Sequence, residues 1–92
     1  MLEGIKVIEY ATYMAAPGAG CILSDWGADV IKIEPPAGDP LRQRAPHPSP
    51  EARAQGASCA WLAGNAGKRS HVLDLAGSEA DRTAFVALAA TA

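Results

Sequence analysis

Aromatic residues and cysteines are both scarce in this sequence, and each scarcity excludes a class of protein. Only 5% of the 92 residues are aromatic, so a core has to be built mostly from alanine, valine, isoleucine and leucine. Two cysteines are too few for a disulfide scaffold. The cysteine content therefore favours a reduced, cytoplasmic setting.

An excess of positive charge and long apolar runs are also missing. With 8 basic and 10 acidic residues, the net charge of −2 argues against a nucleic-acid binder that relies on a strong basic field. No apolar run approaches the roughly 20 residues that a membrane span needs, and no charged-then-apolar leader opens the chain. We therefore expect a cytoplasmic protein without nucleic-acid or membrane partners.

What is present fits a folded interior of limited size. Hydrophobic residues make up 49% of the chain and the mean hydropathy is +0.02, which is typical of a globular domain rather than a disordered tail. A chain of this length makes one small domain or part of a larger one.

The first third of the chain has the pattern of a strand, a helix and a second strand. Residues 5–10 form a β-branched run, residues 15–26 carry apolar positions at helical spacing, and residues 30–34 form another β-branched run before two prolines. This order predicts two parallel strands joined by a right-handed crossover.

The rest of the chain divides into a proline-rich segment and a second strand–helix pair. Residues 35–57 hold six of the seven prolines and are predicted to be an irregular loop. A third strand is expected at 71–75, followed by a helix with Ser78 as N-cap and Phe85 and Leu88 on its apolar face. An α/β sheet normally continues from such a helix into another strand, so residues 1–92 are interpreted as an N-terminal fragment, with a small complete domain as the alternative.

A dinucleotide-binding site is the first functional hypothesis that this pattern suggests. Glu34 ends the second strand, where an acidic residue can hold a ribose hydroxyl. The glycine spacing does not fit, because Gly18 and Gly20 are followed by Leu23 at the third position and fall within the predicted helix. Small residues that allow close helix–sheet packing are the better interpretation.

The ends of the parallel strands are the general place for a ligand in such a sheet. Ligands lie beyond the carboxyl ends, which are predicted here at residues 10–15, 34–36 and 74–76. The N-terminus of the helix near Ala15 can receive a phosphate or carboxylate. Arg42, Lys68 and Arg69 are the cations that a polyanionic ligand would recruit, although ordinary surface charges explain each of them as well.

The remaining reactive side chains give no catalytic or metal site. The two histidines and two cysteines have no zinc-site spacing, and Cys59 has no recognisable base near it in the sequence. No acid–base pair can be named, so no catalytic residue and no metal ligand is predicted.

Three stretches of the sequence carry a family resemblance. They are L-x-G-I-K-V-I-E-Y near the start, then A-P-G and S-D-W-G-A-D-V-I-K-I-E-P-P-A-G-D-P-L-R, and finally N-A-G-K-R-S-H-V-L-D-L. From Leu2 to about Leu75 the chain resembles the opening of a family III CoA-transferase, a family that includes formyl-CoA transferase, carnitine CoA-transferase and alpha-methylacyl-CoA racemase.

The resemblance implies a fold, an assembly and a ligand. The fold is α/β, a Rossmann-like parallel sheet forming the N-terminal part of the large domain, and the full-length protein would be an interlocked homodimer. Coenzyme A is the implied ligand, as a substrate rather than a prosthetic group. By position in the family, its adenosine diphosphate portion would contact residues after the three strands, namely Met14, Ala15, Pro35, Leu73, Asp74, Leu75 and Ala76.

Three of these positions differ from what relatives often carry. Met14 stands where formyl-CoA transferase has Gln, Pro35 where relatives often have Arg, and Ala76 where many have Lys. The resemblance therefore implies more reliance on backbone contacts, and the hypothesis is that Arg42, Lys68 or Arg69 compensates.

The resemblance also implies the reaction. Family transferases move CoA from an acyl-CoA to a carboxylic acid acceptor through a catalytic Asp, which lies beyond the matched region. None of Asp25, Asp29, Asp39, Asp74 and Asp81 inherits that role, so the chain alone is expected to be inactive. The alternatives are an acyl-CoA racemase and a non-catalytic remnant or interaction domain.

Overall fold

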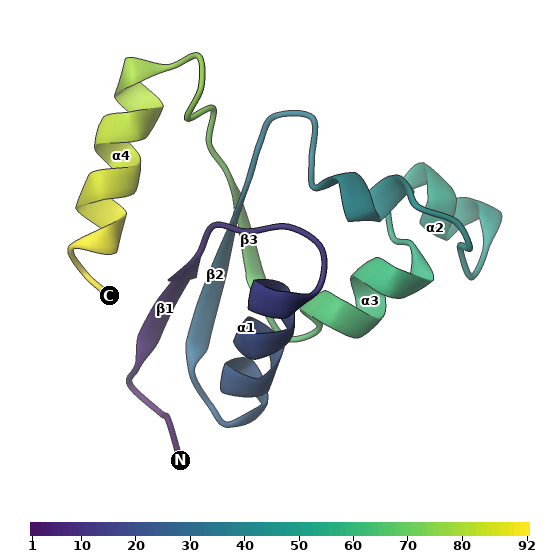
Figure 1. The fold of residues 1–92 in the computed structure, drawn as a ribbon, viewed down its shortest axis with the longest axis horizontal. Coiled ribbons are helices and arrows are strands. Elements are labelled where there is room, and N and C mark those ends of the chain that lie inside the picture. The colour runs from purple at the N-terminus through teal and green to yellow at the C-terminus, as the bar shows by residue number, and fades with distance from the viewer.

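The computed structural model describes residues 1–92 as a three-stranded parallel sheet with helices on both faces (Figure 1). The elements are β1 (Lys6–Glu9), α1 (Ala15–Asp25), β2 (Asp29–Glu34), the 3₁₀ helix η1 (Pro40–Gln43), α2 (Pro50–Ala54), α3 (Cys59–Asn65), β3 (Arg69–Val72) and α4 (Glu79–Ala89). The strand order is β1-β2-β3, and both pairings are parallel. The predicted α/β class and strand–helix–strand unit are therefore confirmed. None of the helices is both long enough and apolar enough to cross a membrane.

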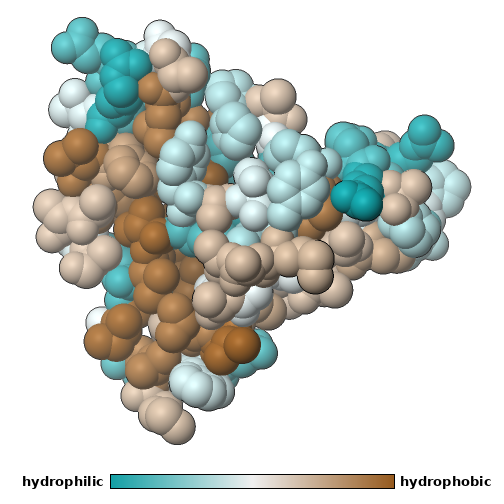
Figure 2. Space-filling view, viewed as in Figure 1, coloured by the Kyte–Doolittle hydropathy of each residue, from teal (hydrophilic) through white to brown (hydrophobic).

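The pleat of β2 separates two kinds of side chain onto the two faces of the sheet. Ile31 and Ile33 point to one face, where they form a buried cluster with Leu73. Phe85 and Leu88 of α4 pack against this cluster, as the apolar stripe of that helix predicts. Figure 2 shows hydrophobic residues as a band that runs along the sheet beside α4.

The opposite face of the sheet is polar and lies under α1, α3 and η1. Glu9, Lys32 and Glu34 share this face and are all buried. Of the 15 buried residues, six are hydrophobic, six are polar or charged, and three are glycine or proline. A sheet face with buried charges requires that each charge find a partner, because an unpaired buried charge is strongly unfavourable.

The proline-rich segment 35–57 contains two short helices, and its prolines help to start them. Asp39 accepts a hydrogen bond from the Leu41 N–H at the start of η1, and Ser49 accepts one from the Ala52 N–H at the start of α2. In both cases a proline occupies the first turn, where its missing N–H costs nothing. The irregular loop expected from composition is thus more ordered than its proline content indicates.

The third strand lies nearer the N-terminus than the expected range of 71–75. β3 pairs with β2 from Ile31↔Arg69 to Glu34↔Val72, and the Leu73 N–H makes the last bond, to the Glu34 carbonyl. Pro35 ends β2 directly after Glu34, so β3 has no partner strand beyond that point. The helix after it begins as predicted, because the Ser78 hydroxyl accepts a hydrogen bond from the Asp81 N–H.

Candidate functional site

The carboxyl ends of the strands form one edge of the molecule, and a small hollow lies there. We call it the strand-end crevice: a cavity of about 280 Å³ between the ends of β1 and β2. Its lining residues are Tyr10, Ala11, Thr12, Ile33, Pro35 and Asp39. In an open parallel sheet this is the edge where ligands bind.

A cluster of paired charges lies under the crevice, and we call it the buried ionic network; its members are Glu9, Lys32, Glu34, Asp39, Arg42 and Lys68. The Lys32 ammonium is at its centre and only 1% exposed. It contacts Glu9 Oε2 at 2.6 Å and Asp39 Oδ2 at 3.3 Å, and it donates to the Ala11 carbonyl at 2.9 Å. One ammonium therefore ties together the end of β1, the start of the β1–α1 connection and the loop after β2.

Glu9 also pairs with a second cation of the network, Lys68. Its Oε1 lies 2.7 Å from the Nζ of Lys68, whose side chain is 2% exposed. The same ammonium donates to the Pro17 carbonyl of α1 and to Asn65 Oδ1 of α3. Lys68 therefore links both helices on the polar face to the end of β1.

Glu34 and Arg42 form the other half of the network. Arg42 Nε and Nη2 donate to the two Glu34 carboxylate oxygens at 2.7 and 2.8 Å, an arrangement that matches the planar fork of the guanidinium. The Glu34 carboxylate also accepts from the Asp39 N–H and from Ser70 Oγ. The Arg42 guanidinium stacks on the Trp61 ring, 3.8 Å from its centroid, which fits the interpretation of Trp61 as a packing residue.

These contacts set the pKa of Glu34. Burial alone raises the pKa of a carboxyl group, but the hydrogen bonds from Arg42, Ser70 and the Asp39 N–H outweigh it and lower the pKa of Glu34 from 4.5 to about 2. Glu34 is therefore held as an anion and is engaged on both oxygens. This pairing removes the basis for a ribose-binding role, in agreement with the glycine spacing.

The three cations predicted to meet a polyanionic ligand are all paired inside the chain. Arg42 is paired with Glu34, Lys68 with Glu9, and Arg69 with Asp29, where two guanidinium nitrogens donate to the carboxylate. Each of them has a structural partner, and a contact with coenzyme A stays a prediction for Arg42 and Lys68.

The residues predicted to contact the adenosine diphosphate portion of coenzyme A follow the three strands, and they differ in how exposed they are. Met14, Ala15, Pro35 and Ala76 are exposed, and no side chain caps the N-terminus of α1 beside Met14 and Ala15. The side chain of Leu73, in contrast, is buried in the core.

The rest of the β3–α4 turn is held by α4. The Asp74 N–H donates to Asp81, and the carbonyls of Leu75 and Ala76 accept from Arg82. This turn is fixed in place before any ligand arrives.

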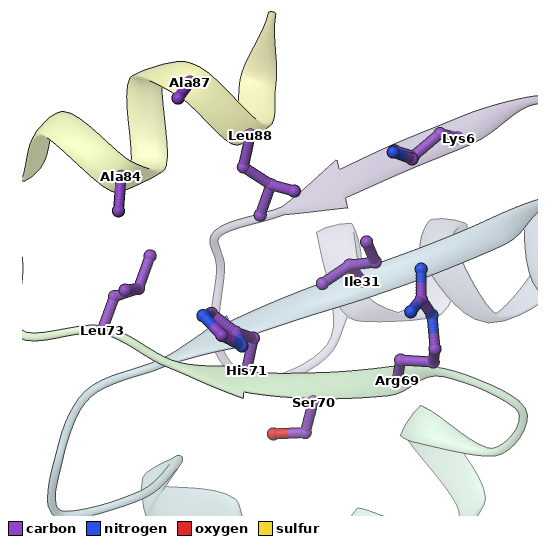
Figure 3. Close-up of a pocket in the computed structure, with 9 residues that line it drawn as sticks. All are labelled: Lys6, Ile31, Arg69, Ser70, His71, Leu73, Ala84, Ala87 and Leu88. Atoms are coloured by element: carbon purple, nitrogen blue, oxygen red, sulfur yellow. The ribbon is translucent and has the colours of Figure 1, made fainter. Parts of the chain in front are cut away.

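The largest cavity of the structure, about 620 Å³, lies away from this edge, between α4 and the sheet (Figure 3). Lys6 and Arg69, the first residues of β1 and β3, line it together with Leu73, Ala84 and Leu88. Lys6 donates to Thr91 and Arg69 is paired with Asp29, so both cations are already engaged. Of the residues predicted to meet a ligand, Leu73 and Arg69 line this cavity.

Comparison with known proteins identifies the relatives of this chain. The model of CoA-transferase family III matches residues 2–92. A cinnamoyl-CoA:phenyllactate CoA-transferase from Clostridium sporogenes is 49% identical over 77 residues, which are 82% of this chain and 18% of that relative. A succinate–glutarate CoA-transferase from Agrobacterium fabrum is also 49% identical, over 76 residues that are 80% of this chain and 19% of the relative.

Solved structures agree with these sequence relatives. A CAIB/BAIF family protein from Brucella suis superimposes with a TM-score of 0.86 and 39% identity over 98% of this chain and 23% of its own. A hypothetical protein from Mycobacterium tuberculosis superimposes with a TM-score of 0.82 and 37% identity, covering 100% of this chain and 23% of its own. The chain thus spans about a fifth of the length of the proteins that it matches.

We predict that the buried ionic network tolerates no side chain at position 20, whereas a side chain at position 18 leaves it undisturbed. A Cβ on Gly20 would overlap the Glu9 carboxylate and lie 3.3 Å from Lys68 Cε, whereas a Cβ on Gly18 meets nothing within 4 Å. Gly18→Ala should stabilise α1 by about 0.5–1 kcal/mol, because glycine is a poor helix former. Gly20→Ala should destabilise the protein by about 1–3 kcal/mol, because Glu9 must move away from its cations. Urea denaturation of both variants checks this, and equal effects would contradict it.

The low pKa of Glu34 predicts a loss of stability in acid. Because the pKa is lower in the folded than in the unfolded protein, the contribution of Glu34 is complete above about pH 4.5 and is lost as the pH falls from 4.5 to about 2. The free energy of unfolding of Glu34→Gln should be lower at neutral pH and should converge with wild type in acid. Glu51→Gln, on the exposed side of α2, makes the same charge change and should follow the wild-type profile throughout.

Proposed function

The chain belongs to CoA-transferase family III, and on that premise we propose that it forms the N-terminal, coenzyme A-binding segment of an enzyme that moves CoA from an acyl-CoA to a carboxylic acid. The observation that carries the proposal is the position of the strand-end crevice. Met14, Ala15, Pro35 and Ala76 are exposed at the same edge of the sheet where topology places a ligand and where the family resemblance implies adenosine diphosphate.

The uncapped N-terminus of α1 is the feature best suited to a phosphate group. A helix N-terminus presents unpaired N–H groups and a partial positive charge, and no side chain caps this one. The small side chains of Ala15 and Ala16 leave the backbone open to a ligand. We infer that phosphate binding here depends on the backbone, with Arg42 or Lys68 contributing only if it leaves its partner in the network.

The proposed reaction exchanges one thioester for another. The C–S bond of the donor acyl-CoA breaks, and a C–S bond to the carboxyl carbon of the acceptor forms. One oxygen of the acceptor carboxylate passes to the donor acyl group, which leaves as a carboxylate. No step of this exchange is assigned to a residue of this chain, because the resemblance places the catalytic Asp beyond the matched region. Four of the five aspartates here are also engaged in structural contacts, such as Asp29 with Arg69 and Asp39 with Lys32.

The names of the sequence relatives favour a transferase activity over a racemase or a non-catalytic remnant. Sequence relatives with curated names include a cinnamoyl-CoA:phenyllactate and a succinate–glutarate CoA-transferase. No observation in the structure favours a racemase or a non-catalytic remnant. The proposal extends to a full-length cytoplasmic enzyme that acts as an interlocked homodimer.

An assay of the full-length protein carrying this segment tests the reaction. We expect a new acyl-CoA to form only when both an acyl-CoA and a carboxylate are supplied. With an ¹⁸O-labelled acceptor, one labelled oxygen should appear in the acid released from the donor. Inversion of an α-methylacyl-CoA without any acceptor would contradict the proposal and favour the racemase.

A negative charge at the start of α1 should weaken coenzyme A binding. Ala15→Glu places a carboxylate beside the proposed phosphate position, and repulsion of the order of 1 kcal/mol at about 4 Å predicts roughly a fivefold or greater rise in Kd. The helix itself should not suffer, because acidic residues are favourable in the first turn. Ala19→Glu, exposed one turn further along α1, is the control and should leave the Kd unchanged in calorimetry. An equal rise in both variants would contradict the placement.

A further inference from the structure

A second cavity, of about 490 Å³, is lined by residues that directly follow those of the strand-end crevice in the chain. Tyr13 and Met14 before α1, Leu41 and Arg44 around η1, and Ala60, Ala63 and Gly64 of α3 line it. Thr12 of the crevice directly precedes Tyr13, and Asp39 of the crevice lies two positions before Leu41. The two hollows are therefore lined by adjoining stretches of the same two segments.

The lining of this second cavity is apolar apart from one cation. Its walls are small or hydrophobic side chains, Arg44 is its only charged residue, and no carboxylate lines it. Its volume lies in the range of about 300–1,000 Å³ that is usual for small-molecule sites. Such a lining suits a hydrocarbon chain that carries one negative charge.

The guanidinium of Arg44 has no partner in the chain. Of the eight lysine and arginine side chains, six make hydrogen bonds or ion pairs, and Arg44 and Arg53 make neither. Arg42, two positions earlier, differs from Arg44, because two of its guanidinium nitrogens donate hydrogen bonds to the carboxylate of Glu34. Arg44 is thus a free cation beside an apolar cavity.

The backbone beside the cavity is strained in the way that binding sites often are. Tyr13 adopts a φ of 66°, in the left-handed region that is rare for a bulky residue and costs about 1–3 kcal/mol. This turn directs the chain from the end of β1 into α1 and places Tyr13 and Met14 in the cavity wall.

We propose that this cavity holds the acyl group of a dicarboxylic substrate, with its carbon chain against Leu41 and Met14 and its distal carboxylate on Arg44. The inference rests on the proposed function, because an acyl group reaches this cavity only as the thioester of coenzyme A bound at the strand ends. A guanidinium pairs with a carboxylate through two charge-assisted hydrogen bonds. A purely hydrocarbon acyl group would leave the Arg44 cation unpaired against an apolar wall, so the site discriminates against it.

The test compares two acyl-CoA donors of equal chain length, glutaryl-CoA and valeryl-CoA, in the full-length protein with propionate, a monocarboxylate, as a common saturating acceptor. We expect wild type to prefer glutaryl-CoA. Arg44→Ala should lower kcat/KM for glutaryl-CoA by about ten- to a hundredfold, the range expected for a hydrogen bond to a charged group, and should change kcat/KM for valeryl-CoA by less than threefold. Arg44→Lys should recover part of the loss, because it keeps the charge but not the fork.

Arg53→Ala is the matched control, because Arg53 is the other unpartnered arginine and does not line this cavity. It should leave the preference for glutaryl-CoA unchanged. Equal losses for both donors in Arg44→Ala, or a wild-type preference for valeryl-CoA, would overturn the inference while leaving the proposed function intact. Failure of wild type to transfer CoA from either donor to any carboxylate would overturn the proposed function and this inference with it.

Discussion

The ammonium of Lys32, enclosed between Glu9 and Asp39, is the contact on which the rest of this structure depends. A charge that is 1% exposed must be neutralised, since removing one partner of a buried pair commonly costs about 3–5 kcal/mol. Its two carboxylates come from the end of β1 and from the loop after β2. The pairing of the first two strands and the path of the proline-rich segment are therefore fixed by the same atom.

The network also decides which groups are left for a ligand. Glu34 engages Arg42 and Glu9 engages Lys68, so these cations of the network already have partners. What stays open at this edge is backbone at the start of α1, the small residues after each strand, and Arg44 beside its apolar cavity. The buried charges of the polar face are thus neutralised within the scaffold, and the groups left for the proposed ligand lie in the loops around it.

Much of the fold follows from local sequence, and the site follows only in part. The strand–helix–strand unit, the cap at Ser78 and the α4 stripe were predictable because propensity, capping and apolar spacing act over a few residues. The edge of the sheet that holds the crevice was predictable from parallel topology. The short helices in 35–57 were missed because proline content indicates loop, although Asp39-Pro40 and Ser49-Pro50 are also helix-start signals.

The sequence by itself determined the fold class and the family, and it predicted the edge of the sheet for a ligand, because these depend on periodicity and on motifs within short stretches. Only the tertiary structure decided which cations are paired and which is free, since Glu9 and Lys68 lie far apart in the chain and meet through the packing of α1 and α3 on the sheet. The sequence gives no reason to distinguish Arg42 from Arg44. In the structure Arg42 is paired with Glu34, whereas Arg44 lines the apolar cavity without a partner in the chain.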